Sequence, residues 1–346
     1  MSGRVQDFRL PPERVAALPA HDRIEIVGQA IAFSSGSRIK DSHPLAFDLA
    51  RNERVCTADI MAALGRPDDV RGAFTSSDLG AAVTQALKLI VLDVRRERGI
   101  PEHRAIVSPT ELPSFEDYAT PRHHPLALPE VIGELREIPT MPAALGWAGL
   151  KVKTFGGILG FSRQAIINAD WPLLRSLAFE LTDAALRAER AEVIRVLTDN
   201  AALDDGLELF HADRGNLITG EGVGNVTSLS SMFRALRMME AVPGTLAGPL
   251  NISGTIIALP AGDEIEASIL EIAGALELRI IADAALTDWY LLPNPALRPV
   301  IALAHLGALE PVIDMQQSFD SEAWGVRVRH DIGASAVSPF AVRAVA

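Results

Sequence analysis

Cysteine is almost absent from the sequence, which has Cys56 alone among 346 residues. A single cysteine excludes an intramolecular disulfide and any metal site built from several cysteines, and it suits a reducing compartment. A catalytic thiolate at Cys56 would need a histidine partner and an electropositive setting. The neighbouring Arg-Val and Thr-Ala indicate neither. We therefore interpret Cys56 as a packing residue.

Long hydrophobic runs and excess positive charge are also missing. No stretch approaches the roughly 18 to 20 apolar residues that span a bilayer, and the start Met-Ser-Gly-Arg-Val-Gln-Asp lacks an apolar signal core. We therefore expect neither export nor membrane insertion. Lys and Arg number 32 against 44 Asp and Glu, for a net charge of -12. An acidic surface repels nucleic acid, which argues against a generic DNA- or RNA-binding module but not against a container.

The usual glycine-rich cofactor motifs are not present in a functional form. Residues 220–225, Gly-Glu-Gly-Val-Gly-Asn, lack a following Gly-Lys-Ser/Thr and contain an acidic residue, so they indicate a surface loop. Residues 156–160, Gly-Gly-Ile-Leu-Gly, lack the strand, turn and helix of a dinucleotide site, and they indicate a bent strand. We predict that the chain binds no cofactor.

Catalytic and metal-binding patterns are missing as well. The sequence contains no Gly-x-Ser-x-Gly and no His-Glu-x-x-His. His211 and Asp213 lie close in sequence, but no third metal ligand stands at a recognisable spacing. The remaining candidates, His103, His123 and His124, are dispersed among prolines and are interpreted as surface or hydrogen-bonding residues. We predict no catalytic residue and no metal. A cytosolic hydrolase built on Cys56 or His211 is the enzymatic alternative.

The composition is that of an ordered protein, with 48% hydrophobic and 22% charged residues. The length allows two lobes, or an extended body with a second lobe. Residues 1–70 are the least regular part, with early prolines, and predict an arm. Within this arm, residues 23–33 alternate apolar and polar side chains and then become apolar, which predicts a strand.

Two helices are predicted with clear ends. Residues 77–98 repeat apolar side chains at helical spacing, and Gly99 ends the run. Arg95, Arg96 and Arg98 lie in the last turn, where they complement the helix dipole rather than form a nucleic-acid patch. A longer helix begins at Asp170, its N-cap, and spans about 28 residues or roughly 40 Å. Few compact enzymes of this size need such a rod.

Between these helices, residues 129–162 carry several prolines and glycines around short alternating segments, which predicts a two-stranded excursion from the core. Further along, the pattern predicts helices from Thr227 to Met239 and from Asp263 to Ala273. Apolar and alternating runs predict strands at residues 254–260, 278–282, 289–292, 300–304, 312–315 and 325–329. A mixed α+β architecture with a central sheet follows.

Four segments together resemble the major capsid proteins of tailed bacteriophages and prophages. They are residues 73–79 (Ala-Phe-Thr-Ser-Ser-Asp-Leu), 155–170, 197–217 and 326–334 (Val-Arg-Val-Arg-His-Asp-Ile-Gly-Ala). The resemblance covers about residues 70–346 in the same order, within a subgroup of Mu-like head subunits that often occur as fusions to a prohead protease. No protease precedes the capsid region here, so any maturation cleavage is expected to need a separate enzyme.

The resemblance implies an HK97-like capsid fold with an N-terminal arm, an E-loop, a P-domain with a long spine helix, and an A-domain. On this basis the expected segments are the arm at 1–70, a P-domain-associated helix and loop at 71–128, the E-loop at 129–162, the P-domain with its spine helix at 163–224, the A-domain at 225–305, and C-terminal strands at 306–346.

The function implied is self-assembly into pentamers and hexamers of an icosahedral virion head, built in the host cytoplasm, that encloses double-stranded DNA without sequence-specific binding. Portal, scaffold, protease and decoration proteins are the other expected partners. An encapsulin-like compartment that holds an enzyme cargo is the alternative within the same fold. Four charged residues of the predicted excursion are expected to contact adjacent subunits: Glu134, Arg136, Lys151 and Lys153.

Overall fold

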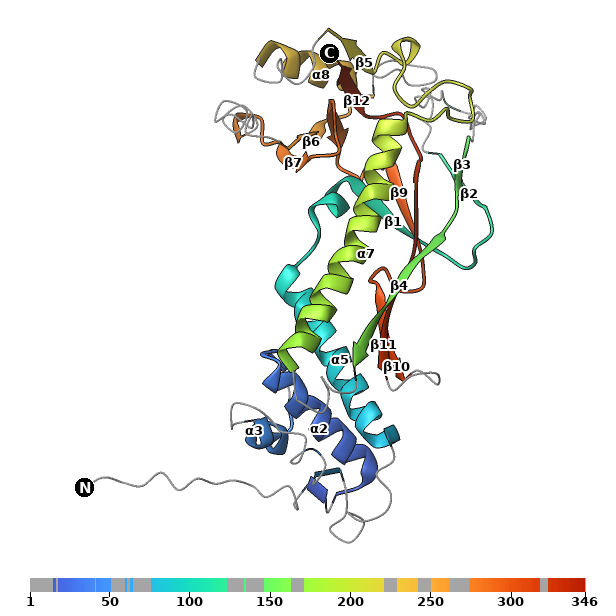
Figure 1. Ribbon diagram of the computed structural model, residues 1–346. Coiled ribbons are helices and arrows are strands. Elements are labelled where there is room, and N and C mark those ends of the chain that lie inside the picture. The colour runs from blue at the N-terminus through green and yellow to red at the C-terminus, as the bar shows by residue number, and fades with distance from the viewer. Residues whose placement is uncertain are drawn as a thin grey trace, which may run out of the picture. The chain divides into compact units, whose positions relative to one another are not determined.

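A computed structural model of the chain describes residues 15–16, 18–40, 42–50, 60, 63–64, 76–122, 134, 146–162, 171–220, 229–241, 250–261, 274–317 and 323–345. The chain divides into two compact units, each with a hydrophobic core of its own. Unit 1 comprises Met1–Gly99, Phe155–Arg187 and Glu310–His330, and unit 2 comprises Ile100–Thr154, Ala188–Leu309 and Asp331–Ala346. Helices and strands are mixed in one α+β fold, as predicted (Figure 1).

Helices dominate unit 1. They are α2 (Ala20–Ser34), α3 (Pro44–Ala50), α5 (Ser76–Arg98) and the first part of α7 (Trp171–Asp199). Helix α5 confirms the predicted helix, and Gly99 takes the left-handed φ of 69° that ends it. Arg98 pairs with Asp183 and lies over the ring of Phe179, 4.6 Å from its centroid, so this arginine is engaged within unit 1.

The predicted strand at residues 23–33 is wrong, because this segment lies in helix α2. Ile26, Val27, Ala30 and Ile31 are all buried, and their spacing places them on one face of a helix. That face packs against α5, and a Cβ at Gly28 would lie only 3.0 Å from the side chain of Gln85. The sequence pattern of residues 23–33 is compatible with a strand or a helix, and packing against α5 selects the helix.

Unit 1 also contains a small layer of strands. Strand β10 (Val312–Gln317) pairs antiparallel with the first part of β11 (Ala323–Ala336), and β4 (Lys153–Ser162) also pairs with β11. The fully buried Trp171, Leu174 and Ala178 of α7 belong to the same core as Val326 of β11. One face of α7 therefore helps to form the core of this unit.

Unit 2 is built on a sheet in the order β5-β12-β8-β6-β7. Its strands are β5 (Leu217–Thr219), β6 (Gly254–Pro260), β7 (Arg279–Asp283), β8 (Trp289–Pro293) and β12 (Val342–Val345). Helix α8 (Leu229–Glu240) buries Met232, Ala235 and Met239 in the core that these strands line. The central strand β8 is buried along its whole length, as expected of a strand covered on both faces.

A second group of strands in unit 2 joins segments that are far apart in the sequence. Strand β1 (Val107–Leu112) runs parallel to β9 (Ile301–Leu306), which pairs antiparallel with the last residues of β11. Strands β2 (Tyr118–Pro121) and β3 (Trp147–Leu150) form a separate antiparallel ribbon, with Tyr118 opposite Leu150. This ribbon joins residues 147–150, inside the excursion predicted at 129–162, to residues 118–121, which lie before it, so the excursion within those bounds stays a prediction.

The long helix predicted from Asp170 is α7, which has 29 residues and contributes Trp171–Arg187 to unit 1 and Ala188–Asp199 to unit 2 (Figure 1). Most other predicted elements are confirmed with small shifts of their ends, except that β11, predicted at 325–329, continues to Ala336. They are α8, β6, β7, β8, β9, β10 and β11. Strands β1, β2, β5 and β12 were not predicted. The helix expected at 263–273, the cap at Asp170, Cys56, His123 and His124 lie outside the described residues.

Candidate functional site

A buried ion-pair cluster fastens the second part of α7 to the start of unit 2. Glu189, in α7, has no exposed surface. Arg104 donates to both of its carboxylate oxygens, from Nε at 2.6 Å and from Nη2 at 2.8 Å, and His103 Nε2 lies 2.8 Å from Oε1. Both partners come from the 3₁₀ helix Glu102–Ile106, which leads directly into β1. The cluster therefore fixes the position of β1 relative to α7.

The next residue of α7 forms a second link to the same unit. Arg190 donates to the carboxylate of Asp283, which is buried at the end of β7 and also accepts from the backbone N–H of Ala285 at 2.9 Å. Burial alone raises the pKa of Asp283, but the hydrogen bonds from Arg190 and Ala285 outweigh it and hold that pKa below its ordinary value. Asp283 is thus a charged anchor for α7.

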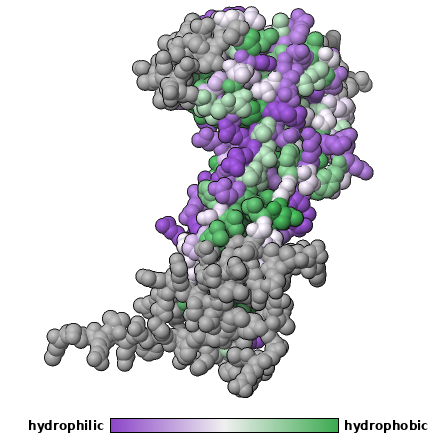
Figure 2. All heavy atoms as spheres, viewed as in Figure 1, coloured by the Kyte–Doolittle hydropathy of each residue, from purple (hydrophilic) through white to green (hydrophobic). Residues whose placement is uncertain are grey.

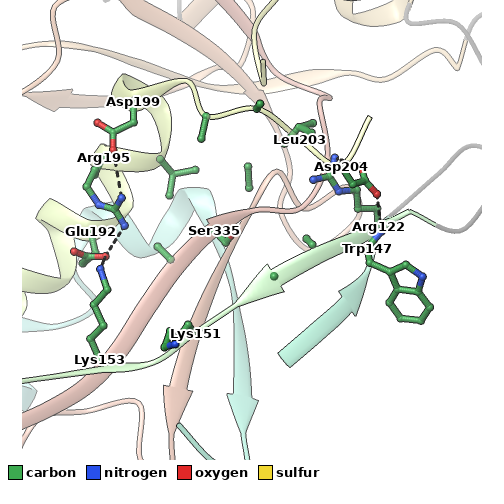
Figure 3. A pocket seen from close by; sticks show the side chains of 17 residues that line it. Arg122, Trp147, Lys151, Lys153, Glu192, Arg195, Asp199, Leu203, Asp204 and Ser335 are labelled. Atoms are coloured by element: carbon green, nitrogen blue, oxygen red, sulfur yellow. Dashed lines mark hydrogen bonds and ion pairs between the residues drawn. The ribbon is translucent and has the colours of Figure 1, made fainter. Parts of the chain in front are cut away.

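An open pocket of about 530 Å³ lies in unit 2 beside the second part of α7. On its α7 side, Glu192 lies 2.8 Å from Arg195 Nη2 and 3.8 Å from Lys153 Nζ, and Arg195 Nη1 lies 3.3 Å from Asp199. Figure 3 shows these side chains as a row of alternating charge. Each of these charged groups has an opposite partner, so the row provides no unpaired base.

The other side of the pocket holds the end of the β2–β3 ribbon. Asp204 accepts a hydrogen bond from the backbone N–H of Trp147 at 2.7 Å and pairs with Arg122 Nη1 at 2.8 Å. Burial lowers the pKa of Arg122, against the opposing effects of Asp204 and Asp205. The indole of Trp147 points away from the pocket (Figure 3) and is 51% exposed. A half-exposed tryptophan held by its backbone is a feature that the sequence analysis missed.

Of the four predicted contact residues, two lie at the same pocket. Lys151 and Lys153 both lie at this pocket and are 58% and 55% exposed. Lys151 Nζ already has a partner in its own chain, Asp117 Oδ1 at 3.0 Å. Glu134 is an exposed turn residue, and Arg136 lies outside the described residues. Whether any of the four contacts an adjacent subunit remains a prediction.

The candidate catalytic histidines serve local structure. His211 accepts a hydrogen bond through Nδ1 from the backbone N–H of Asp213 at 3.2 Å, which makes it the cap of a short 3₁₀ helix. His103 is buried in the cluster around Glu189. Within the described ranges, no group of three or more His, Cys, Asp or Glu residues is placed to hold a metal ion, and no helix is long and apolar enough to cross a membrane.

Two further features were missed at the sequence level. Glu189 stands among buried apolar residues of α7, and a charge on such a face is itself a signal for a buried partner. Ile158 and Leu159 of β4 are 71% and 40% exposed. The sequence does hold a signal for this exposed apolar pair, because the run around it contains no charged residue. The prediction of a bent strand at residues 156–160 did not include the exposure of these side chains.

Comparison with solved structures gives low sequence identity over most of the chain. A phage-related protein from Bordetella bronchiseptica RB50 is 9% identical, with 74% of this chain and 95% of that chain covered and a TM-score of 0.47. The capsid of a native GTA particle is 8% identical, with coverage of 71% and 91% and a TM-score of 0.49. A virus-like particle from Pyrococcus furiosus is 11% identical, with coverage of 75% and 98% and a TM-score of 0.45.

No curated protein sequence matches the chain. Residues 148–345 match the family described as phage capsid protein. The matched region takes in α7 with its Glu189 and Arg190 anchors, the central strands of unit 2, and β4 with the end of the ribbon. The match covers more than half of the 346 residues, so the chain belongs to the phage capsid protein family.

Proposed function

We propose that this protein is the major capsid subunit of a tailed phage or prophage, and that it assembles into pentamers and hexamers of an icosahedral head enclosing double-stranded DNA. The family match over residues 148–345 carries this proposal. The role is structural and not catalytic, in keeping with that family. The virion is its proposed final location, after assembly in the cytoplasm of a bacterial host.

Two features of the fold support a structural role. The first is α7, at roughly 43 Å by its 1.5 Å rise per residue, with charged anchors at Glu189 and Arg190. The second is the β2–β3 ribbon, which presents the half-exposed Trp147. In HK97-like terms, α7 corresponds to the spine helix of a P-domain, the segment around 129–162 to the E-loop, and residues 225–305 to an A-domain.

Negative charge suits a container for DNA. A net charge of -12 discourages tight binding of a packaged polyanion, so the DNA stays free to be packed and released. Shell stability then comes from many modest protein contacts that act together. Glu134, Arg136, Lys151 and Lys153 are proposed to supply some of these contacts. Portal, scaffold, protease and decoration proteins are proposed as further partners, and membership of the Mu-like subgroup is proposed on the resemblance alone.

Sedimentation velocity of the purified full-length chain tests the proposal. We expect species of many subunits, in discrete sizes, that form above a threshold concentration. A chain that stays a monomer or small oligomer across protein and salt concentrations would reject the capsid assignment. Particles that enclose a co-purified enzyme in place of DNA would favour an encapsulin-like compartment instead.

A further inference from the structure

Exposed apolar surface alone does not mark a binding site on unit 2. Figure 2 shows hydrophilic and hydrophobic side chains mixed over the coloured part of this unit's visible face. A pocket with mostly apolar walls and a few placed polar groups is a more specific feature. One such pocket, which we call the β6–β8 pocket, lies where β6 begins and β8 ends and has a volume of about 450 Å³.

A single charged side chain stands among the described residues that line the β6–β8 pocket, and this distinguishes it from the pocket beside α7. Four apolar residues form much of its wall, and two polar residues carry hydrogen-bond donors. The apolar residues are Leu250, Ile252, Pro293 and Leu297, and the two donors are Thr255 and Arg298. Leu297 is 75% exposed, so a ligand in the pocket would find apolar surface that is still in contact with water.

Arg298 is a half-buried cation for which the described residues supply no carboxylate. Its backbone N–H donates to the carbonyl of Asn294 at 2.9 Å, and its Cζ lies 5.8 Å from the centroid of the Phe340 ring. A ring face attracts a cation but leaves the in-plane N–H donors of the guanidinium available. By contrast, Arg104 and Arg190 of the same unit are paired with carboxylates. A partly desolvated cation without an acceptor is unfavourable, and a bound anion would supply that acceptor.

Thr255 brings a second unused donor to the β6–β8 pocket. It lies between Gly254 and Ile256, where the register of β6 against β8 shifts as at a β-bulge. A bulge changes the direction in which a side chain points. The Oγ1 hydroxyl of Thr255 is shielded from solvent and has no hydrogen-bond partner among the described residues. The residue as a whole is only half-buried, so a change of its χ1 rotamer can turn the hydroxyl towards a ligand.

We propose that the β6–β8 pocket binds a carboxylate carried on a short apolar chain. A planar carboxylate accepts two parallel N–H donors from one guanidinium, and its remaining lone pairs can accept from the hydroxyl of Thr255. The one positive charge of Arg298 balances one negative charge, whereas a phosphate dianion would stay partly uncompensated. The apolar walls then cover the chain next to the carboxylate. The site lies within unit 2 of a single chain, so the inference does not rest on the proposed capsid function.

An NMR titration of the full-length chain, followed by the signals of the ligand, tests the chemistry of the site. Hexanoate is the probe, inorganic phosphate offers charge without an apolar chain, and hexan-1-ol offers the chain without a carboxylate. We expect saturable binding of hexanoate and at least about tenfold weaker binding of the other two. A protein that binds hexanoate no better than phosphate or hexan-1-ol would overturn the proposal.

Substitutions in the β6–β8 pocket test its two donors. We expect Arg298→Gln to weaken hexanoate binding at least about tenfold, and Thr255→Val, which keeps the shape but removes the hydroxyl, to weaken it about threefold. Arg298→Lys keeps the charge without the planar fork and should give an intermediate affinity. Arg187→Gln in unit 1 loses the same charge outside the pocket and should bind as wild type does. Circular dichroism checks the folding of each variant, and wild-type affinity in folded Arg298→Gln would contradict the proposal.

Two sources can supply a carboxylate on an apolar chain, namely a free short-chain fatty acid and the C-terminus of an apolar peptide. A tripeptide of alanine and valine with a free C-terminal carboxylate separates them. Tighter binding of this peptide than of hexanoate would assign the site to a protein C-terminus, and equal or weaker binding would assign it to a free fatty acid. The same tripeptide with an amidated C-terminus should not displace hexanoate. Displacement by the amide would overturn the role of the carboxylate.

Discussion

Glu189 lies fully buried in α7, and Arg104 binds both of its carboxylate oxygens, at 2.6 Å from Nε and 2.8 Å from Nη2. This two-pronged geometry is the strongest arrangement available to an arginine and a carboxylate. Two hydrogen bonds fix the orientation of the guanidinium group as well as its distance from the carboxylate. The 3₁₀ helix that carries Arg104 and leads into β1 is therefore held at one position along the second part of α7. In the proposed capsid, such a fixed frame would let each subunit present the same surfaces to its neighbours.

Loss of Arg104 should therefore be costly. In Arg104→Met, the buried Glu189 loses the arginine that binds both of its oxygens, and removing one partner of a buried ion pair destabilises a protein by about 3 to 5 kcal/mol. We expect a loss of that size in the free energy of unfolding of the unassembled subunit, measured with urea and circular dichroism. A loss below about 1 kcal/mol would show that the pair is dispensable.

The double substitution Arg104→Met with Glu189→Leu is the matched control. It removes both charges, and apolar replacements of a buried ion pair are often close to neutral. We expect the double variant to be more stable than Arg104→Met alone. If the two variants are equally unstable, the lost stability arises from packing and not from the lost charge interaction between Arg104 and Glu189.

Acid should weaken the link between Arg190 and Asp283. Arg190 and the N–H of Ala285 hold the pKa of Asp283 below its ordinary value of 3.8. The folded protein thus binds this proton less tightly than the unfolded chain, and the stabilisation is fully present above 3.8 and is lost as the pH falls through the lower, folded-state pKa. We expect Asp283→Asn to lower Tm at pH 7 and the difference from wild type to shrink as the pH falls below 3.8.

Thermal unfolding across this pH range measures that difference. A difference in Tm between wild type and Asp283→Asn that stays constant from neutral to acidic pH would contradict the proposed charge interaction. Altered packing at position 283 would lower Tm equally at every pH.

Gly333 of β11 should tolerate no side chain. A Cβ at this position would overlap the carbonyl oxygen of Lys151, which is backbone and cannot rotate away. We expect Gly333→Ala to destabilise the subunit by about 1 to 3 kcal/mol, measured by urea unfolding. Gly149→Ala in β3 is the control, since a Cβ there would meet nothing within 4 Å. Equal effects of the two substitutions would contradict the close approach.

A substitution at Lys151 should change assembly without changing the stability of the single chain. Its ion pair with Asp117 joins side chains that are 58% and 74% exposed, and such surface pairs contribute at most about 1 kcal/mol. We expect Lys151→Glu to leave the unfolding free energy within about that range while it lowers the assembled fraction in sedimentation. Unchanged assembly would argue against an intersubunit contact at Lys151.

The long helices and most central strands were predictable, because their signals are local. Helix α5 repeats apolar residues at helical spacing and ends at Gly99, and β8 is a continuous apolar run. The strand expected at residues 23–33 failed because the segment satisfies both periods, and packing against α5 selects the helix. Short strands such as β5 and β12 are defined by partners distant in sequence, which a local pattern does not specify.

The site was less accessible to sequence analysis than the fold. Lys151 and Lys153 were singled out by their location in the predicted excursion, which the resemblance implies to be the E-loop. The anchors Glu189 and Asp283 depend on partners at Arg104 and Arg190, which come together only through the packing of α7 in unit 2. The exposure of Ile158 had a local signal, the uncharged apolar run around it, but whether that run is covered depends on the packing of the sheet.

Electron microscopy of the purified full-length protein tests the central claim most directly. We predict closed shells of uniform size, or rings of five and six subunits, because a major capsid subunit assembles with itself into symmetric particles. A small globular species that stays small at every protein and salt concentration would contradict the account.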